Sequence, residues 1–286
     1  MNGSRAPDRT DDILLVAIAR GWPPATWGSL LARAEYQAGR LQAMADRSGG
    51  RLTLIRQRGD LEAFLARRAT DPGIVGGLLA IEGAHALDGD PVNVDRLAAA
   101  GYRIVAPTHF FDNDFAGSAH GLEQDGLTPL GRELIARLEG ASLIVDLAHA
   151  SARTIDDVLS MATRPVVASH TGVSGTADNA RNLSDKQLRG IAATGGMVGI
   201  GFWPTATGGE DAASIGRVIA YAAGVIGVEH VGLGSDFDGA VPVPFDASGL
   251  ALVTEALLAQ GFDEAAIGRI MGANAVDLLM RCLPVT

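Results

Sequence analysis

Five short apolar runs in this chain each end in a side chain that can bind a metal ion or transfer a proton. The runs lie at 77–81, 104–108, 143–148, 165–169 and 231–235, and the residues that follow them are Glu82, His109, His149, His170 and Asp236. Segments with helical spacing of apolar residues separate the runs. Apolar runs of this length are typical of buried parallel strands. The pattern therefore indicates an α/β fold with reactive side chains at its strand ends.

Strands and helices are expected to alternate from residue 51 onward. The expected strands are 51–55, 77–81, 103–108, 143–148, 165–169, 196–202 and 230–235. The expected helices are 26–47, 61–68, 93–100, 129–138, 152–162, 184–194, 211–227 and 248–260, followed by two short ones. Ser184 with Gln187, and Thr154 with Asp157, resemble capping arrangements at helix starts.

We expect these strands to form a (β/α)8 TIM-type barrel whose N-terminal strands are shortened or irregular, with residues 1–286 as a single domain. A chain of 286 residues suits one such barrel, for which roughly 250 residues is typical. An open doubly wound sheet would gather its ligands at one switch point, whereas here reactive residues follow five strands. An eighth strand must then come from the first 25 residues.

Charge and composition exclude several classes of partner. A net charge of −10 argues against nucleic acid or an anionic membrane surface. The N-terminus shows no signal-peptide pattern, and the apolar stretch 13–19 is too short to span a bilayer, so we expect a cytoplasmic protein. A single cysteine, Cys282, excludes an internal disulfide framework.

His149 and His170 are the strongest candidates for metal ligands. They lie 21 residues apart, one strand–helix unit, and should be neighbours at the barrel mouth. Neutral imidazole is a common ligand for zinc. Glu82 precedes a glycine, so its carboxylate can point inward and bridge two cations. The alternative is that the histidines are hydrogen-bonded structural residues and that Glu82 forms a salt bridge at the rim.

Three further residues could act on a substrate. Asp236 lies in Gly-Ser-Asp-Phe-Asp-Gly at 234–239 and could orient a metal-bound water and transfer its proton. His109 could polarise a carbonyl group, and Arg181 could pair with a substrate carboxylate. The polar segment 110–127 is expected to be a functional loop. We assign no role to the remaining histidines, His85, His120 and His230.

The ordered set of motifs resembles the renal (membrane) dipeptidase family of zinc peptidases. The matching segments are Ile-Glu-Gly-Ala-His at 81–85, Thr-His at 108–109, Asp-Leu-Ala-His-Ala-Ser at 146–151, Ala-Ser-His-Thr at 168–171, Ala-Arg-Asn-Leu-Ser-Asp at 180–185, Ala-Thr-Gly-Gly-Met-Val-Gly-Ile at 193–200, Gly-Ser-Asp-Phe-Asp-Gly at 234–239 and Met-Gly-Ala-Asn-Ala at 271–275. Each motif is weak alone, but the ordered set is specific. The resemblance runs from about residue 50 to the C-terminus.

The resemblance implies a (β/α)8 barrel that hydrolyses a dipeptide into two amino acids through a zinc-activated water. It implies that Glu82 bridges two zinc ions and that His149 and His170 bind the second. The bimetal centre would lower the pKa of the bound water and polarise the carbonyl.

The same resemblance assigns substrate contacts. His109 would contact the substrate carbonyl, Arg181 the terminal carboxylate, and Asp236 both the bridging water and the amine. The expected partner is a small dipeptide or amide, with no nucleic acid and no membrane, and a homodimer is left open.

The chain departs from the family at its first strand. The family begins with His-x-Asp, the pair that binds the first zinc, but no histidine occurs here before His85. The nearest counterpart places Thr10 at the histidine position and keeps Asp12 as the aspartate. A threonine does not replace imidazole as a strong zinc ligand. We therefore expect one or two zinc ions, with an incomplete first site.

Three functions remain open at this point. The first is a metal-dependent dipeptidase. The second is an amidase or lactonase that uses one metal ion bound by Glu82, His149 and His170, since a mononuclear site needs three protein ligands and an open position. The third is a non-catalytic, dipeptidase-like binding protein.

Overall fold

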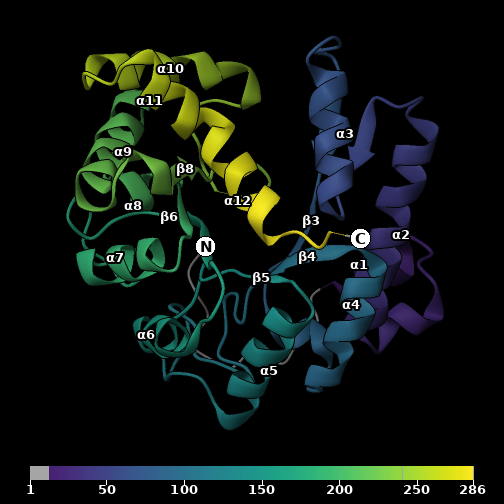
Figure 1. Ribbon diagram of the computed structural model, residues 1–286. Helices are drawn as coiled ribbons and strands as arrows, with labels where there is room; N and C mark the ends of the chain where they lie inside the picture. The colour runs from purple at the N-terminus through teal and green to yellow at the C-terminus, as the bar shows by residue number, and fades with distance from the viewer. Residues whose placement is uncertain (1–12, 240, 286) are drawn as a thin grey trace.

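The computed structural model describes residues 13–239 and 241–285, and all pairings between its strands are parallel. The strands are β1 (Leu52–Leu54), β2 (Val75–Gly77), β3 (Leu79–Ile81), β4 (Tyr102–Val105), β5 (Ile144–Val145), β6 (Val167–Thr171), β7 (Met197–Ile200) and β8 (Val231–Leu233). They run through the middle of the molecule, and the helices lie around them (Figure 1). The expected α/β fold with parallel strands is confirmed.

The strands form three sheets in chain order: β1-β2, β3-β4-β5 and β6-β7-β8. Only Leu78 separates β2 from β3, so the expected strand 77–81 is divided between two sheets. Gly76 and Gly77 lie at this break, and glycine weakens a strand interior. An isolated parallel bridge between Asp146 and Val167 joins the neighbouring edges of β5 and β6. No sheet closes among the described residues, so the complete barrel is not observed.

The expectation of an eighth strand is wrong for the described part of the first 25 residues. Leu14–Ala19 form the helix α1, and Pro24–Trp27 form a short 3-10 helix. Leucine and alanine favour a helix, and proline suits a first helical position. Thr10 and Asp12, which the sequence placed at the first metal site, lie outside the described residues.

The longer helices begin near the expected residues, mostly at side-chain caps. They are α2 (Leu30–Arg47), α3 (Arg58–Arg68), α4 (Val94–Ala100), α5 (Pro129–Gly140), α6 (Ala152–Met161), α7 (Asp185–Ala193), α9 (Ala212–Ile226), α10 (Leu250–Ala259) and α12 (Asn274–Cys282), and the short helices α8 (Pro204–Thr207) and α11 (Glu264–Gly268) complete the set. The capping box of Ser184 and Gln187 is confirmed. The cap expected from Thr154 and Asp157 is wrong, because Ser151 caps α6 by accepting the Thr154 N–H.

The core lies between the strands and the surrounding helices. Val105, Val198 and Val231 of the strands are buried in one apolar cluster with Leu134 of α5 and Ile219 of α9. This packing encloses the strands and leaves the residues beyond their carboxyl ends to carry polar side chains. No described helix combines the length and the apolar character that a membrane crossing requires.

Asn274 joins the last helix to the last strand. Its side-chain amide donates to the carbonyl groups of Val228 at 2.7 Å and Val231 at 2.8 Å, and its side chain is buried. This residue is the asparagine of the Met-Gly-Ala-Asn-Ala segment. The amide therefore fixes α12 against the start of β8, the strand that precedes Asp236.

We predict that Asn274→Ala lowers the free energy of unfolding by about 2 kcal/mol or more, because two carbonyl groups lose their donor. Urea denaturation of the purified variant measures this loss. The exposed Asp277 on the same helix provides the control, and Asp277→Asn is expected to change stability by no more than about 0.5 kcal/mol. Equal effects of the two substitutions would contradict the assignment.

Candidate metal centre

Glu82, His149 and His170 bring one ligand atom each to a common point. Within the described part of the chain, these atoms all lie within 4.8 Å of one another. The two Nε2 atoms are 2.9 Å apart, and Glu82 Oε1 lies 3.3 Å from His170 Nε2 and 3.7 Å from His149 Nε2. Tetrahedral zinc with bonds near 2.0–2.1 Å separates its ligands by about 3.3 Å. The donor set and its spacing therefore fit a divalent metal ion.

Burial keeps both imidazole rings neutral. It is the main cause that lowers the pKa of His170 to about 3, and it lowers the pKa of His149 further; the Arg181 charge acts in the same direction on both. Neutral imidazole has a free lone pair, which is the form that binds a metal ion. The structure thus provides two nitrogen ligands that need not lose a proton at physiological pH.

The backbone at two strand ends is held in an uncommon conformation. His149, beyond β5, has φ of 64°, and Asp236, beyond β8, has φ of 58°. Non-glycine residues in this region cost of order 1–3 kcal/mol and cluster at functional sites. Gly83 has φ of 94°, and a Cβ there would lie 2.2 Å from the His85 ring, so only glycine allows the chain to turn directly after Glu82.

His109 lies on the other side of the Glu82 carboxylate. Its Nε2 is 3.2 Å from Glu82 Oε2, whereas His149 and His170 face Oε1. The rings of His109 and His149 meet edge to face with centroids 4.5 Å apart. The two oxygens of Glu82 therefore face different partners: Oε2 faces His109, and Oε1 faces His149 and His170.

Arg181 is a cation held beside the centre. One guanidinium nitrogen donates to the His170 carbonyl at 2.7 Å, and the group lies over the Trp203 ring at 5.6 Å. No ion pair with Arg181 occurs among residues 13–239 and 241–285. Burial lowers the pKa of Arg181 to about 10, although the carboxylates of Asp146, Glu82 and Asp236 oppose the shift. Arg181 is therefore charged at neutral pH and can accept a carboxylate partner.

The pKa of Asp236 is shifted by burial and by neighbouring charges. Burial raises the pKa of its carboxyl to about 6, the charges of Glu82 and Asp238 add to this, and Arg181 opposes it. The charges of Glu82 and Arg181 therefore act on the Asp236 carboxyl. Of the residues that the sequence predicted as metal ligands or substrate contacts, Asp12 lies outside the described residues.

Sequence reasoning missed His120 and Trp203. His120 packs against the rings of His149 and Phe110 at centroid distances of 5.4 and 5.2 Å, and burial is the main cause that lowers its pKa to about 4. The loop that carries it is fastened by the Ala119 N–H, which donates to the His149 carbonyl at 2.8 Å. In the sequence, His120 could have been found from its place in the polar segment 110–127, which was expected to be a functional loop. Trp203 gave no comparable signal.

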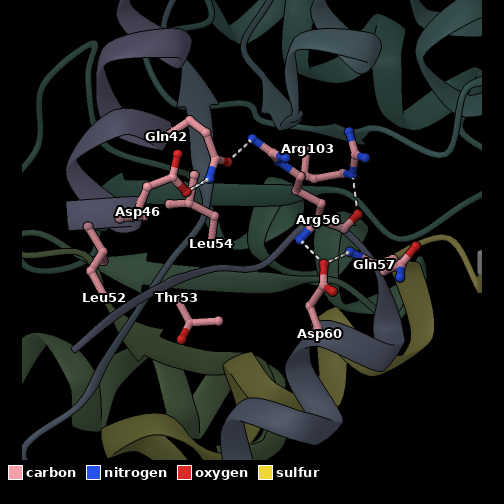
Figure 2. A pocket seen from close by; sticks show the side chains of 10 residues that line it. Gln42, Asp46, Leu52, Thr53, Leu54, Arg56, Gln57, Asp60 and Arg103 are labelled. Carbon is pink, nitrogen blue, oxygen red and sulfur yellow. Dashed lines mark hydrogen bonds between the residues drawn. The ribbon is translucent and has the colours of Figure 1, made fainter. Parts of the chain in front are cut away.

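A separate hollow of about 510 Å³ lies between α2, β1, α3 and the start of β4 (Figure 2). Its two arginines are engaged inside the protein: Arg56 donates to the Gln42 side chain, and Arg103 donates to the carbonyl groups of Arg56, Ala98 and Tyr102. The hollow contains none of the strand-end residues above. The candidate metal centre is therefore separate from this hollow.

The chain is similar to a known family of peptidases. Residues 20–282 match the model of a family described as membrane dipeptidase, peptidase family M19. A Klebsiella pneumoniae protein, described as uncharacterized and encoded in the pqqA 5' region, is 31% identical over 255 residues, which cover 84% of this chain and 92% of that protein. Dipeptidase aclJ of Aspergillus oryzae is 31% identical over 218 residues, 73% of this chain; the chain spans 52% of that relative.

The solved structures that resemble this chain include a member of the same family. Dipeptidase AC, a metallo peptidase of family M19, has a TM-score of 0.76 and 30% identity, and the match covers 86% of this chain and 76% of that one. A metallo peptidase from Rhodobacter sphaeroides, solved with a phosphinate mimic of the dipeptide L-Ala-D-Ala, has a TM-score of 0.75 and 29% identity, covering 86% and 73%. The match over residues 20–282 shows that this chain belongs to the membrane dipeptidase family, peptidase family M19.

Proposed function

We propose that this chain hydrolyses the peptide bond of dipeptides at a zinc centre held by Glu82, His149 and His170. The observation that carries the proposal is the convergence of these three ligand atoms within 4.8 Å in a chain of the M19 family. A bound divalent ion lowers the pKa of a water ligand and polarises a carbonyl oxygen. Zinc is proposed because two imidazoles and a carboxylate are ligands that it favours.

The residues around the centre have complementary roles in this proposal. The Arg181 guanidinium, which has no carboxylate partner among the described residues, binds the terminal carboxylate of the substrate. His109, on the Oε2 side of Glu82, donates to the carbonyl oxygen as negative charge develops there. Asp236 accepts a proton from the attacking water and transfers it to the leaving amine, a task that suits a carboxyl with a raised pKa.

We also propose that the strands belong to a (β/α)8 barrel. The strands follow one another in chain order, and the Asp146–Val167 bridge joins two of the three sheets. In such a barrel, residues beyond the carboxyl ends of the strands share one face. The proposal accounts for the arrival of residues from β3, β4, β5, β6 and β8 at one centre.

A hydrolase with one metal ion is the second candidate, favoured by the fact that the described residues form a group of three ligands. In this case Glu82 binds one ion and Asp12 binds none. An amide or a lactone then becomes an alternative substrate. The number of metal ions per chain separates the two proposals.

Metal removal provides the direct test. We predict that the purified protein binds at least one zinc ion per chain and that a chelator abolishes hydrolysis of dipeptides until zinc returns. His170→Ala should weaken zinc binding by more than about 100-fold, exceeding the loss typical of an outer partner. His230, which pairs with the Gly196 carbonyl away from the centre, supplies the matched control, so His230→Ala should retain zinc. Zinc-independent hydrolysis would exclude the proposal.

Asp236→Asn should lower kcat by about 10²- to 10⁴-fold while zinc binding is retained, because the general base is lost. In the parent enzyme, activity should fall as pH decreases and the carboxyl takes up a proton. The pKa of about 6 in the absence of metal sets the upper limit of this midpoint, since a nearby cation stabilises the carboxylate. Measurement of kcat from pH 4 to 8 tests this. Unchanged turnover in Asp236→Asn would favour a different base or a binding protein.

Arg181→Lys should raise KM for dipeptides by about 10-fold or more, since lysine keeps the charge but loses the bidentate geometry. Dipeptide amides, which lack the terminal carboxylate, should be affected little by this substitution. Parallel steady-state kinetics on both substrates provide the comparison. Equal changes for the two would argue that Arg181 acts only through its hydrogen bond to His170.

A further inference from the structure

The strand that carries His170 contains one extra residue. In the pairing of β6 with β7, the register shifts between Ala168 and Thr171. Ser169 and His170 therefore lie opposite a single residue of β7, Gly199. Two residues against one form a β-bulge, which is uncommon between parallel strands and which re-aims side chains next to active sites.

The contacts of Ser169 and His170 differ from those of a regular strand. Successive side chains of a regular strand point to opposite faces, yet the Ser169 hydroxyl oxygen lies 2.8 Å from His170 Nδ1. The Ser169 N–H donates to the Asp146 carboxylate at 2.9 Å. The His170 carbonyl accepts from the Arg181 guanidinium at 2.7 Å. These two backbone groups of the bulge therefore bond to side chains rather than to a neighbouring strand.

Two glycines of the neighbouring strands leave room for the bulge. A Cβ at Gly199 of β7 would lie 2.1 Å from the Ser169 carbonyl oxygen. A Cβ at Gly234, which directly follows β8, would lie 2.3 Å from the same oxygen and 2.8 Å from His170 Cα. These neighbours are backbone atoms, which cannot move away by a change of rotamer. The carbonyl group of the bulge thus occupies the space in which two side chains would begin.

We infer that this bulge aims His170 at the metal position and that Gly199 and Gly234 are the positioning residues that maintain it. The ring so placed has its Nε2 2.9 Å from His149 Nε2 and 3.3 Å from Glu82 Oε1. Neither glycine contributes an atom to the ligand group. The inference rests on the proposed metal centre and concerns how one of its three ligands is held.

The bulge also connects the metal centre to the proposed substrate site. Its His170 side chain faces the metal position, while the carbonyl group of the same residue holds Arg181. A shift of the bulge should therefore move both groups, and turnover alone would not separate the two effects. Zinc affinity in the absence of substrate reports on His170 directly.

Gly199→Ala tests the inference, with zinc affinity measured by competition against a chromophoric chelator. The added methyl group forces β6 to move at the bulge, so zinc binding should weaken by more than about 10-fold. Gly234→Ala should have the same effect. X-ray absorption spectra of the zinc-loaded variants should show one imidazole ligand, whereas the parent protein should show two.

Gly196→Ala is the matched control for a loss of stability. A Cβ at Gly196 would lie 1.9 Å from the Val166 carbonyl oxygen, so the same kind of clash arises at the opposite end of β6 and β7. Urea denaturation should show that this variant is destabilised as Gly199→Ala is, but its zinc affinity should equal that of the parent protein. Equal zinc losses in the two variants would overturn the inference.

Deletion of Ser169 provides the test if the alanine variants fail to fold. A single residue then lies opposite Gly199, the pairing becomes regular, and the His170 N–H can reach Asp146 in place of the deleted one. Because the strand is shortened by about 3.3 Å, His170 should leave the centre and zinc binding should weaken by more than about 10-fold. Unchanged zinc affinity in the deletion variant would overturn the inference. A parent chain that binds zinc but hydrolyses no dipeptide would contradict the proposed substrate alone.

Discussion

The two backbone hydrogen bonds that Asp146 accepts join β5 to β6 at the point where the candidate metal centre begins. Without them, little would set the separation between His149, which follows the two-residue strand β5, and His170, which lies within the five-residue strand β6. The bond from Ala148 also stabilises the chain just before the left-handed backbone of His149. A buried carboxylate is costly unless its hydrogen bonds are made. Here burial raises the pKa of Asp146, while the hydrogen bonds from Ser169 and Ala148 counter that shift.

The charges at the centre are complementary to a divalent cation and to a substrate with a carboxylate. Glu82 and Asp236 are acidic, Arg181 is basic, and burial keeps the surrounding imidazoles neutral. Neighbouring carboxylates oppose the decrease in the Arg181 pKa, and their mutual repulsion contributes to the increase for Asp236. A divalent cation would relieve that repulsion, and a substrate carboxylate would pair with the guanidinium. The electrostatics and the ligand geometry therefore favour the same chemistry.

Most of the ligand set could be predicted because strand ends are simple to read. An apolar run that stops at a histidine indicates both a strand and the face on which its end lies, and His149 and His170 meet as their spacing predicted. Helix caps were partly readable: the Ser184 box is confirmed, but Ser151 was overlooked in favour of Thr154. His120 was missed because a loop has no periodicity that shows where its side chains point. Trp203 was missed because it follows β7, whereas His170 and Arg181, which it contacts, belong to β6 and the loop after it.

The sequence by itself determined the parallel α/β fold, the order of the strands and the identity of the strand-end residues, since these follow from local hydrophobic pattern and chain direction. Tertiary structure decided which atoms face one another. One Glu82 oxygen faces His109 and the other faces His149 and His170. The Asp146 carboxylate accepts the N–H groups of Ala148 and Ser169. Tertiary structure also divided the strands into three sheets and made α1 a helix where a strand was expected. These outcomes depend on contacts between residues distant in the chain, which local sequence patterns do not specify.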